Sequence, residues 1–535
     1  MPEIGGKEDL NITSALREPT DDGLVKEDVI SNTVPAKYHG TRADQQDMIV
    51  LGKKQVLRRN FKFITMLGFG STVICSWEVI LPVFSFVLTD GGTALLFWGF
   101  IAIGLGMMLV YASLAEMASM CPTAGGQYHW VSEFSPPKYQ KILSYTTGWL
   151  CAVGWQVFLA SVAFMVGGII QGIIALNDES YGFQRWHATL LTIGIMVFAV
   201  IFNTVLAVRL PFVEGCILIL HLAGFFAVFI PMWVLSPRGK ASDVLFHFEN
   251  NGNWPTVGLS SMIGLTAPLT ALIGYDCSVH MSEELQDASI TMPKAIMWTV
   301  GPNAAFGFLM AVTLCFTVGP DLNAIAETAT GQPFIQVFFN GTRSYLATNF
   351  MVGIVIVCLT SCCISEVATA SRQLWSFARD RGLPASRWLS HVSPGWNIPL
   401  RAVFTSLVIT SLLACINLGS TTALNAINSL GGVSVLSSYI MTIGVLVHRR
   451  LFGPPLPPRR WSLGKFGLAV NIAALCVVIP LWFFLLWPLA QPVTAENMNW
   501  ASAMYGGVML FAIIYYFVWG RHSYEGPVAL VKRDE

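Results

Sequence analysis

The sequence predicts an all-α membrane protein with twelve transmembrane helices, and three observations lead to this fold class. The chain has 535 residues, of which 54% are hydrophobic and only 12% charged, and its mean hydropathy is +0.59. Soluble domains carry about 25% charged residues. Twelve apolar stretches also reach the roughly 20 residues that a helix needs to cross the bilayer. Lys plus Arg equals Asp plus Glu, at 31 each. The composition therefore excludes an ordinary soluble enzyme, a disordered chain and a nucleic-acid binder.

The expected spans follow one another along most of the chain. They cover residues 61–89, 94–119, 141–176, 187–207, 212–236, 256–285, 294–318, 346–379, 400–418, 420–448, 466–490 and 498–520. The third and the eighth are too long for one perpendicular crossing, so we expect them to tilt or to project from the bilayer.

The basic residues of the connections predict the orientation. If the N-terminus is cytoplasmic, 22 Lys and Arg residues fall on the inner side and 4 on the outer side. Because inner loops are enriched in Lys and Arg, both termini are expected in the cytosol. The polar residues 1–55 are expected to form a disordered tail, and residues 521–535 a C-terminal tail. We expect a multi-pass protein of the plasma membrane.

All eleven cysteines lie in or beside apolar segments, and none forms a Cys-x-x-Cys pair at zinc spacing. No metal or cofactor is therefore expected. The sequon at Asn340 falls in the longest outer loop, where it is either glycosylated or unused.

Spans 1 and 6 contain residues that break a helix. Residues 66–82 combine two glycines, hydroxyl groups, Glu78 and a proline, and residues 264–276 combine two glycines, a proline, hydroxyl groups and Asp276. The two spans are five apart and so run in opposite directions, as in an inverted repeat of residues 56–236 and 256–448, followed by two more spans in 466–520. Such repeats place a substrate site between two discontinuous helices. The alternative is a pair of kinked packing helices with satisfied polar groups.

Three stretches carry a family resemblance. They read ASLAEMASMCPTAGGQYHW at 112–130, GYDCSVHMSEELQDASITMPKAI at 274–296 and SRQLWSFARDRGLP at 371–384. The chain resembles the amino acid–polyamine–organocation permeases, in particular the fungal amino acid, choline and GABA permeases, over about residues 50–525. The resemblance implies a sodium-symporter-like fold with a 5+5 inverted repeat and two extra helices. It also implies a central substrate site and, usually, proton coupling.

The resemblance and the breaks together give the candidate residues. The substrate-binding candidates are Cys75, Ser76, Trp77, Glu78, Ile273, Gly274, Tyr275, Asp276 and Glu366. At Cys75–Trp77 many relatives have Gly-Ser-Gly, and only the serine matches; the Trp77 indole is a candidate to stack on a cationic ammonium group.

The proton-coupling candidates are Asp276, Glu78 and His221. For Asp276 the alternatives are a proton carrier, a group that binds the substrate amine, and a cap on the backbone amides of the broken helix. Glu78 either binds a proton or the substrate ammonium group or stabilises the helix break. His221 either exchanges a proton or serves only as a packing residue. Glu366 lies deep in span 8 and could border the cavity. The spacing of Asp276, His280 and Glu283 also fits a metal site, although chance explains it more simply.

These features predict a secondary transporter, not an enzyme, for a small molecule with an amine or ammonium group, with protons as the coupling ion and the lipid bilayer as its surroundings. An exporter, a vacuolar carrier of an amine-containing metabolite and a nutrient sensor with a permease fold remain alternatives. The sequence has neither a phosphate-binding loop nor the motif of a metalloprotease or a nucleophile elbow.

Overall fold

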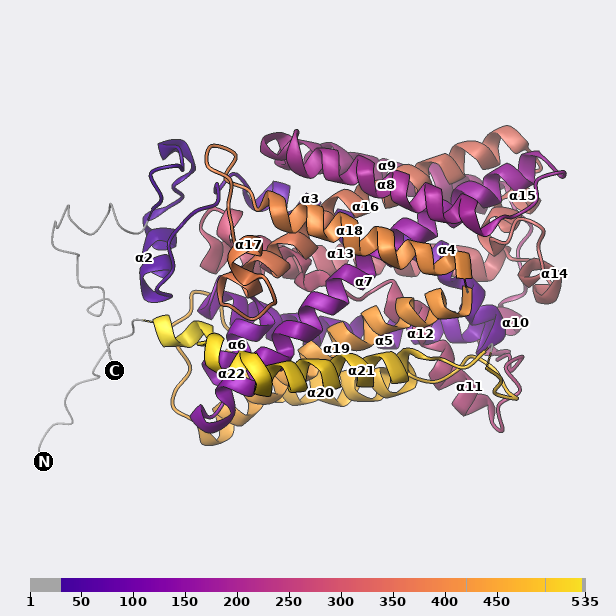
Figure 1. The fold of residues 1–535 in the computed structure, drawn as a ribbon. Helices are drawn as coiled ribbons and strands as arrows, with labels where there is room; N and C mark the ends of the chain where they lie inside the picture. Colours follow the sequence, from indigo (N-terminus) through magenta and orange to yellow (C-terminus); the bar gives the residue numbers. More distant parts are fainter. Residues whose placement is uncertain (1–29, 420, 496, 532–535) are drawn as a thin grey trace, which may run out of the picture.

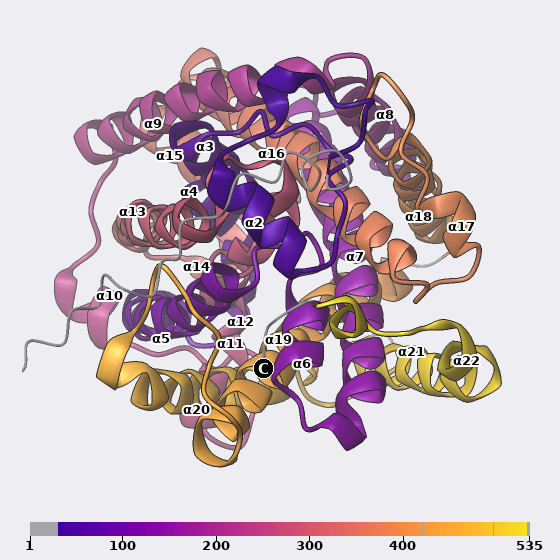
Figure 2. The same cartoon turned by 90° about the vertical axis from the view of Figure 1, so that its left-hand side faces the viewer.

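The computed structural model describes residues 30–419, 421–495 and 497–531. Within these residues the chain is helical, and its only extended pairings are three isolated β-bridges. The long helices lie side by side along the molecule (Figure 1). The helices α2 (Arg42–Val50), α17 (Ser386–Leu389) and α22 (Arg521–Ser523) share one end, which we call the α2 end, and Figure 2 faces it.

The described residues contain twelve segments long and apolar enough to cross a membrane, so the predicted number is confirmed. The first six comprise α3 (Phe63–Ile74) with α4 (Ser76–Thr89), α5 (Gly92–Met120), α7 (Pro137–Asn177), α8 (Arg185–Thr204), α9 (Leu210–Leu235), and α11 (Val257–Gly264) with α12 (Thr266–Thr270) and the 3₁₀ helix η4 (Tyr275–Glu284). The other six comprise α13 (Ala288–Thr317), α16 (Tyr345–Arg379), α18 (Leu400–Gly419), α19 (Thr421–Phe452), α20 (Gly467–Phe484), and α21 (Ala501–Tyr515) with the π-helix η6 (Tyr516–Gly520) and α22.

Further short helices lie between the spans and in the segments before the first span and after the last one. They are η2 (Ala36–Tyr38), α6 (Gln127–Phe134), η3 (Ala207–Arg209), α10 (Ala241–Phe246), α14 (Leu322–Ala326), α15 (Pro333–Thr342), η5 (Gly464–Phe466) and η7 (Pro527–Leu530). The helices α10, α11 and α14 lie at the end opposite to α2, which we call the α11 end (Figure 1).

Spans 1 to 4 each pack against the span five positions later. Span 2 (α5) contacts span 7 (α13), span 3 (α7) contacts span 8 (α16), and span 4 (α8) contacts span 9 (α18). In addition, α4 of span 1 contacts α12 of span 6. Two repeats of five spans in opposite orientation would produce this pairing, although the division at residues 56–236 and 256–448 stays a prediction.

Helix α13 begins six residues earlier than the expected 294. The Asp44 carboxylate accepts hydrogen bonds from the backbone N–H groups of Asp287 (2.8 Å) and Ala288 (2.9 Å). A carboxylate at a helix N-terminus stabilises its unpaired N–H groups. Because this cap comes from a residue 243 positions away, the local sequence does not reveal it.

Part of the tail that was expected to be disordered is folded. Residues 30–55 are described and include α2, whose N-cap Thr41 accepts from the Asp44 N–H. Asp44 is fully buried and pairs with Arg59 at 3.3 Å. The tail is held by buried polar contacts with the span 6–7 connection and by burial of Met48 and Leu51, which are 1% and 2% exposed. Because its polar partners lie far along the chain, its composition did not predict its order. Residues 1–29 lie outside the described part of the chain.

The sequon also has a different setting from the one expected. Asn340 lies within α15, where its Oδ1 accepts from Gln336 Nε2 at 2.9 Å. The site is therefore part of a packed helix and not of an open loop, and its glycosylation stays a prediction.

Candidate functional site

Span 1 is broken at Cys75, within the stretch that the sequence indicated. Cys75 has φ 43° and ψ 45°, the left-handed region, and it separates α3 from α4. The thiols of two cysteines donate to carbonyl groups at the buried C-terminal end of α3: Cys75 Sγ donates to Thr72 O at 2.6 Å, and Cys362 Sγ of α16 donates to Val73 O at 3.0 Å. Carbonyl groups freed by a break within a membrane need such partners.

Span 6 unwinds between α12 and η4. Gly274 adopts φ 105°, which only glycine accommodates without strain. The hydroxyl of Tyr111 on α5 holds this stretch, since it accepts from Gly274 N at 3.1 Å and donates to Leu272 O at 2.9 Å. Tyr275 Oη and Ser76 Oγ are 3.3 Å apart, so a hydrogen bond joins the two breaks.

Asp276 is the centre of a buried polar cluster built from three other helices. Its Oδ2 accepts from Gln127 Nε2 of α6 at 2.5 Å and from Trp155 Nε1 of α7 at 3.2 Å. Its Oδ1 accepts from the Tyr439 hydroxyl of α19. The His280 ring lies 3.6 Å from Oδ2. The Asp276 carboxylate thus binds side chains, and it does not cap the backbone amides at the break of span 6, which was the alternative from the sequence.

Aromatic rings surround this carboxylate. Tyr111 lies between Tyr275 and Tyr439, with ring centroids 4.7 Å and 5.9 Å away, and the Trp155 ring is 6.0 Å from His280. Sequence reasoning missed Tyr111, Trp155, Tyr439 and Gln127, because a single aromatic or amide residue in an apolar span is usually a packing residue. A carboxylate amid aromatic rings is a combination that recognises an ammonium group.

Glu78 and His221 were predicted separately, and the structure brings them together. Glu78 Oε1 and His221 Nδ1 are 2.7 Å apart, and both side chains are buried. Glu78 Oε2 and His221 Nε2 have no hydrogen-bond partner among the described residues. The pair therefore joins the broken span 1 to span 5.

The indole of Trp77 does not face a cavity. Its Nε1 donates to His221 O at 3.2 Å, and its ring packs against Phe225 with centroids 6.0 Å apart. Trp77 is fully buried in this contact with α9. The structure therefore does not support the prediction that this ring stacks on a substrate cation.

Two further carboxylates lie near the span 1 break. Glu366 of α16 is buried, is close to the Cys75 and Cys362 thiols, and has no hydrogen-bond partner for Oε2 among the described residues. Glu214 of α9, which sequence reasoning did not single out, accepts from Ser365 Oγ at 2.7 Å. Every substrate-binding candidate, Glu366 included, is thus buried, with Ile273 the most exposed at 7%.

Two ion pairs join the end of η4 to α16. The Glu283 carboxylate accepts two hydrogen bonds of 2.8 Å from Arg379, and Glu284 accepts from Arg372 Nε at 2.7 Å. Because Arg379 occupies the Glu283 carboxylate, Asp276, His280 and Glu283 do not converge on one metal position.

Lys53 and Asp380 form a further ion pair at the α2 end, 3.3 Å apart. Burial lowers the pKa of Lys53, and Asp380 opposes this shift. The Tyr128 hydroxyl of α6 donates to Asp380 at 2.8 Å. The segment before span 1 is thereby attached to the end of span 8.

A smaller contact lies at the α11 end. Asp90, in the turn after α4, accepts from Ser260 Oγ of α11 at 2.7 Å. Burial raises the pKa of Asp90 to about 6, although the bond from Ser260 acts in the opposite direction. This contact ties the end of span 1 to the start of span 6.

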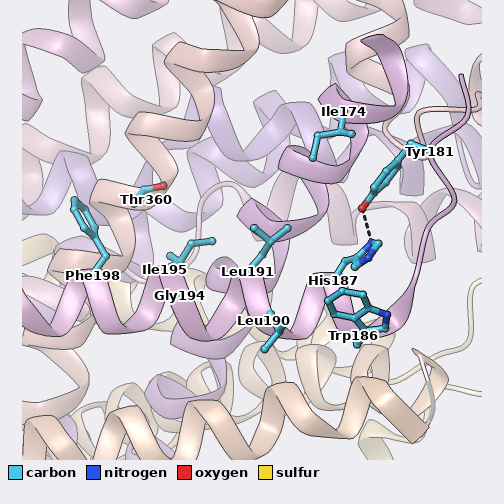
Figure 3. A pocket seen from close by; sticks show the side chains of 10 residues that line it. All are labelled: Ile174, Tyr181, Trp186, His187, Leu190, Leu191, Gly194, Ile195, Phe198 and Thr360. Carbon is cyan, nitrogen blue, oxygen red and sulfur yellow. Dashed lines mark hydrogen bonds between the residues drawn. The ribbon is translucent and has the colours of Figure 1, made fainter. Parts of the chain in front are cut away.

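A pocket of about 690 Å³ lies apart from the breaks, between α7, α8 and α16. Figure 3 shows its apolar lining and, at one end, the hydrogen bond of 2.8 Å between Tyr181 Oη and His187 Nδ1. None of the predicted site residues lines it. Because Trp186, Leu190 and Phe198 are exposed apolar residues of a span, we interpret this pocket as part of the lipid-facing surface.

Comparison with known proteins relates the sequence to membrane transporters. Residues 61–511 match the amino acid permease family. The chain is 30% identical to a protein of Macrophomina phaseolina named as an amino acid/polyamine transporter, over 82% of this chain and 97% of that protein. It is 28% identical to a choline transporter of Saccharomyces cerevisiae (88% and 83%) and 27% identical to an amino-acid permease of Arabidopsis thaliana (90% and 95%). With its twelve spans and two broken helices, this chain belongs to the amino acid permease family of the amino acid–polyamine–organocation superfamily.

Proposed function

We propose that the protein is a proton-coupled transporter that imports a small molecule with an amine or ammonium group by alternating access. The observation that carries the proposal is the buried pair of Glu78 and His221 beside the break of span 1. The substrate would bind at Asp276, near the break of span 6, and the proton at the Glu78–His221 pair.

The substrate class follows from the surroundings of Asp276. Its carboxylate supplies the negative charge, and Tyr111, Tyr275 and Tyr439 supply ring faces at which a cation is stabilised. In this structure Gln127, Trp155 and Tyr439 donate to the carboxylate, so an incoming ammonium group would replace one of these donors. The names of relatives, which include amino acid, polyamine and choline transporters, support the same class.

The coupling role of Glu78 and His221 follows from their burial. An ionised pair in an apolar interior needs its mutual contact, because an isolated buried charge is costly. Protonation of Glu78 would remove the charge attraction that joins α4 to α9, and it would free span 1 to move relative to span 5.

The closed contacts at both ends support alternating access. Substrate would reach the breaks from the α11 end after separation of Asp90 and Ser260, and it would leave at the α2 end after separation of Arg379 from Glu283 and Arg372 from Glu284. We place the α2 end in the cytosol of a plasma-membrane protein because its loops are rich in Lys and Arg. A terminal tag on intact cells should then react with antibody only after permeabilisation.

Uptake into permease-deficient cells tests the proposal. The labelled panel contains GABA, proline, a basic amino acid, choline and a polyamine, at pH 5 and pH 7.5. We expect saturable uptake of at least one compound, stronger at pH 5, and its loss in Asp276→Asn. The matched control Asp243→Asn changes an exposed carboxylate and should transport normally. Correctly inserted protein that takes up none of these compounds would contradict import and favour an exporter, a vacuolar carrier or a sensor.

A further inference from the structure

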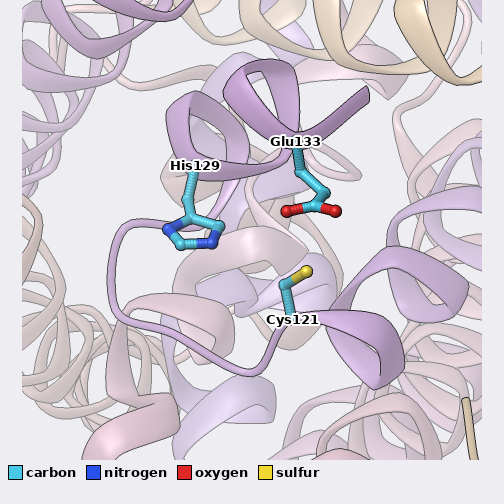
Figure 4. Close-up of side chains that lie close together, drawn as sticks. All are labelled: Cys121, His129 and Glu133. Carbon is cyan, nitrogen blue, oxygen red and sulfur yellow. The ribbon is translucent and has the colours of Figure 1, made fainter. Parts of the chain in front are cut away.

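A second cluster of chemically reactive side chains lies outside the broken spans. Cys121, His129 and Glu133 place a thiol, an imidazole and a carboxylate together (Figure 4). One ligand atom from each lies within 4.8 Å of the other two. The residues are 0%, 0% and 8% exposed, so the three groups face one another in the interior.

The local fold explains how they meet. Cys121 is the C-cap of α5, and His129 and Glu133 are four residues apart on α6, which places them on one face of that helix. The chain between them turns sharply at Gly126, and Trp130 Nε1 donates to Cys121 O at 2.9 Å. The stretch from Cys121 to Glu133 contains a single cysteine, so a search of the sequence for paired cysteines cannot detect the site.

We propose that Cys121, His129 and Glu133 bind one divalent cation of the zinc type. Thiolate, imidazole and carboxylate are the three ligand types of Zn²⁺, at about 2.0–2.3 Å, and a tetrahedral site with these bond lengths has its donors about 3.5 Å apart. The three side chains would move together by roughly 1 Å to reach this geometry. A water molecule completes the coordination.

Binding of such a cation has a defined charge balance. The divalent cation offsets the two negative charges of a thiolate ligand and a carboxylate ligand. On binding, the Cys121 thiol forms the metal–sulfur bond and releases its proton to solvent. Arg449 also approaches, because its Nη1 donates to Glu133 O at 3.0 Å, so the bound metal would compete with this guanidinium for the negative charge.

The position of the site gives it a connection to the broken spans. Helix α6 begins with Gln127, which donates to the Asp276 carboxylate at 2.5 Å. A cation held by Cys121, His129 and Glu133 would fix α6 to the end of α5 and limit the movement of Gln127. Cation binding itself does not depend on the proposed transport function.

Metal titration of the purified full-length chain tests the proposal. After treatment with a chelator, Co²⁺ serves as a spectroscopic probe and Zn²⁺ as its competitor. We expect one equivalent of Co²⁺ with a thiolate-to-cobalt absorption band, which Zn²⁺ abolishes. Cys121→Ser should lose the band and bind Zn²⁺ at least tenfold more weakly. The control Cys315→Ser changes another buried thiol, one that donates to Thr93 O, and should behave like the wild type.

A second readout covers the case in which Cys121→Ser does not fold. Zn²⁺ should raise the melting temperature of the wild type and have a much smaller effect on Glu133→Gln and His129→Gln. The proposal is overturned if the wild type shows no thiolate band, if the band survives in Cys121→Ser, or if Zn²⁺ shifts the melting temperature of Glu133→Gln as much as that of the wild type.

Discussion

Glu78 of span 1 and His221 of span 5 form a buried contact of 2.7 Å between Oε1 and Nδ1, next to the point at which span 1 is broken. The backbone carbonyl of His221 also accepts from the indole of Trp77, so two consecutive residues of α4 hold the same residue of α9. This double attachment fixes the start of α4 to α9.

The first prediction concerns His221. In His221→Gln the amide still reaches Glu78 but cannot carry a proton. We expect the excess of uptake at pH 5 over pH 7.5 to fall at least threefold, whereas the amount of inserted protein changes little. The measurement is initial uptake across pH 5–7.5. His187→Gln, which alters a histidine of the lipid-facing pocket, is the control, and an unchanged pH profile in His221→Gln would exclude a coupling role.

The second prediction concerns the backbone at Cys75. A non-glycine residue in the left-handed region costs about 1 kcal/mol, and a β-branched one costs more. Cys75→Gly should therefore keep the backbone conformation of the break and, although it loses the bond from Sγ to Thr72 O, retain more uptake than Cys75→Val, which should lose most of it. Both are measured against surface expression. Equal uptake by the two variants would show that the conformation at Cys75 is not required.

The sequence predicted the number of spans, the stretches in which two helices break, and Glu78 and His221 as individual candidates. It did not predict that they are partners, because the contact depends on the rotation of α4 relative to α9. Tyr111, Trp155, Tyr439 and Gln127 were missed since each lies on a different helix, and only the fold brings them to Asp276. Asp44 and α2 were missed because their partners lie in the span 6–7 connection.

The third prediction concerns ion pairs at the α2 end. Arg372 and Glu284 are both buried, and removal of one partner leaves an uncompensated charge, which costs about 3–5 kcal/mol. We expect Arg372→Gln to lower the melting temperature of the purified protein markedly. In contrast, Arg381 and Glu525 are 61% and 67% exposed, and Arg381→Gln should change the melting temperature little. Similar shifts in both variants would argue against a structural role for the buried pair.

The fourth prediction concerns Asp90, whose pKa is raised by burial from 3.8 to about 6. Since the folded state favours the neutral acid, its contribution to stability is present below about pH 4 and is lost as the pH rises through 6. Asp90→Asn should therefore melt at a higher temperature than the wild type at pH 7.5, and this difference should shrink toward pH 5.

Ser260→Ala provides the companion measurement, because it removes the hydrogen bond that lowers the pKa of Asp90. We expect the pH-dependent change in melting temperature to move to higher pH in this variant. A wild-type melting temperature whose pH dependence is the same as that of Asp90→Asn would contradict the assignment.

The most direct test of proton coupling uses the purified protein in lipid vesicles with an imposed pH gradient. With a substrate identified by the uptake panel, an inward proton gradient should drive the wild type to accumulate substrate above its external concentration. Glu78→Gln, which keeps the size of the side chain but removes its charge, should only equilibrate the substrate. Accumulation by Glu78→Gln equal to that of the wild type, or wild-type uptake that is indifferent to the gradient, would contradict the account.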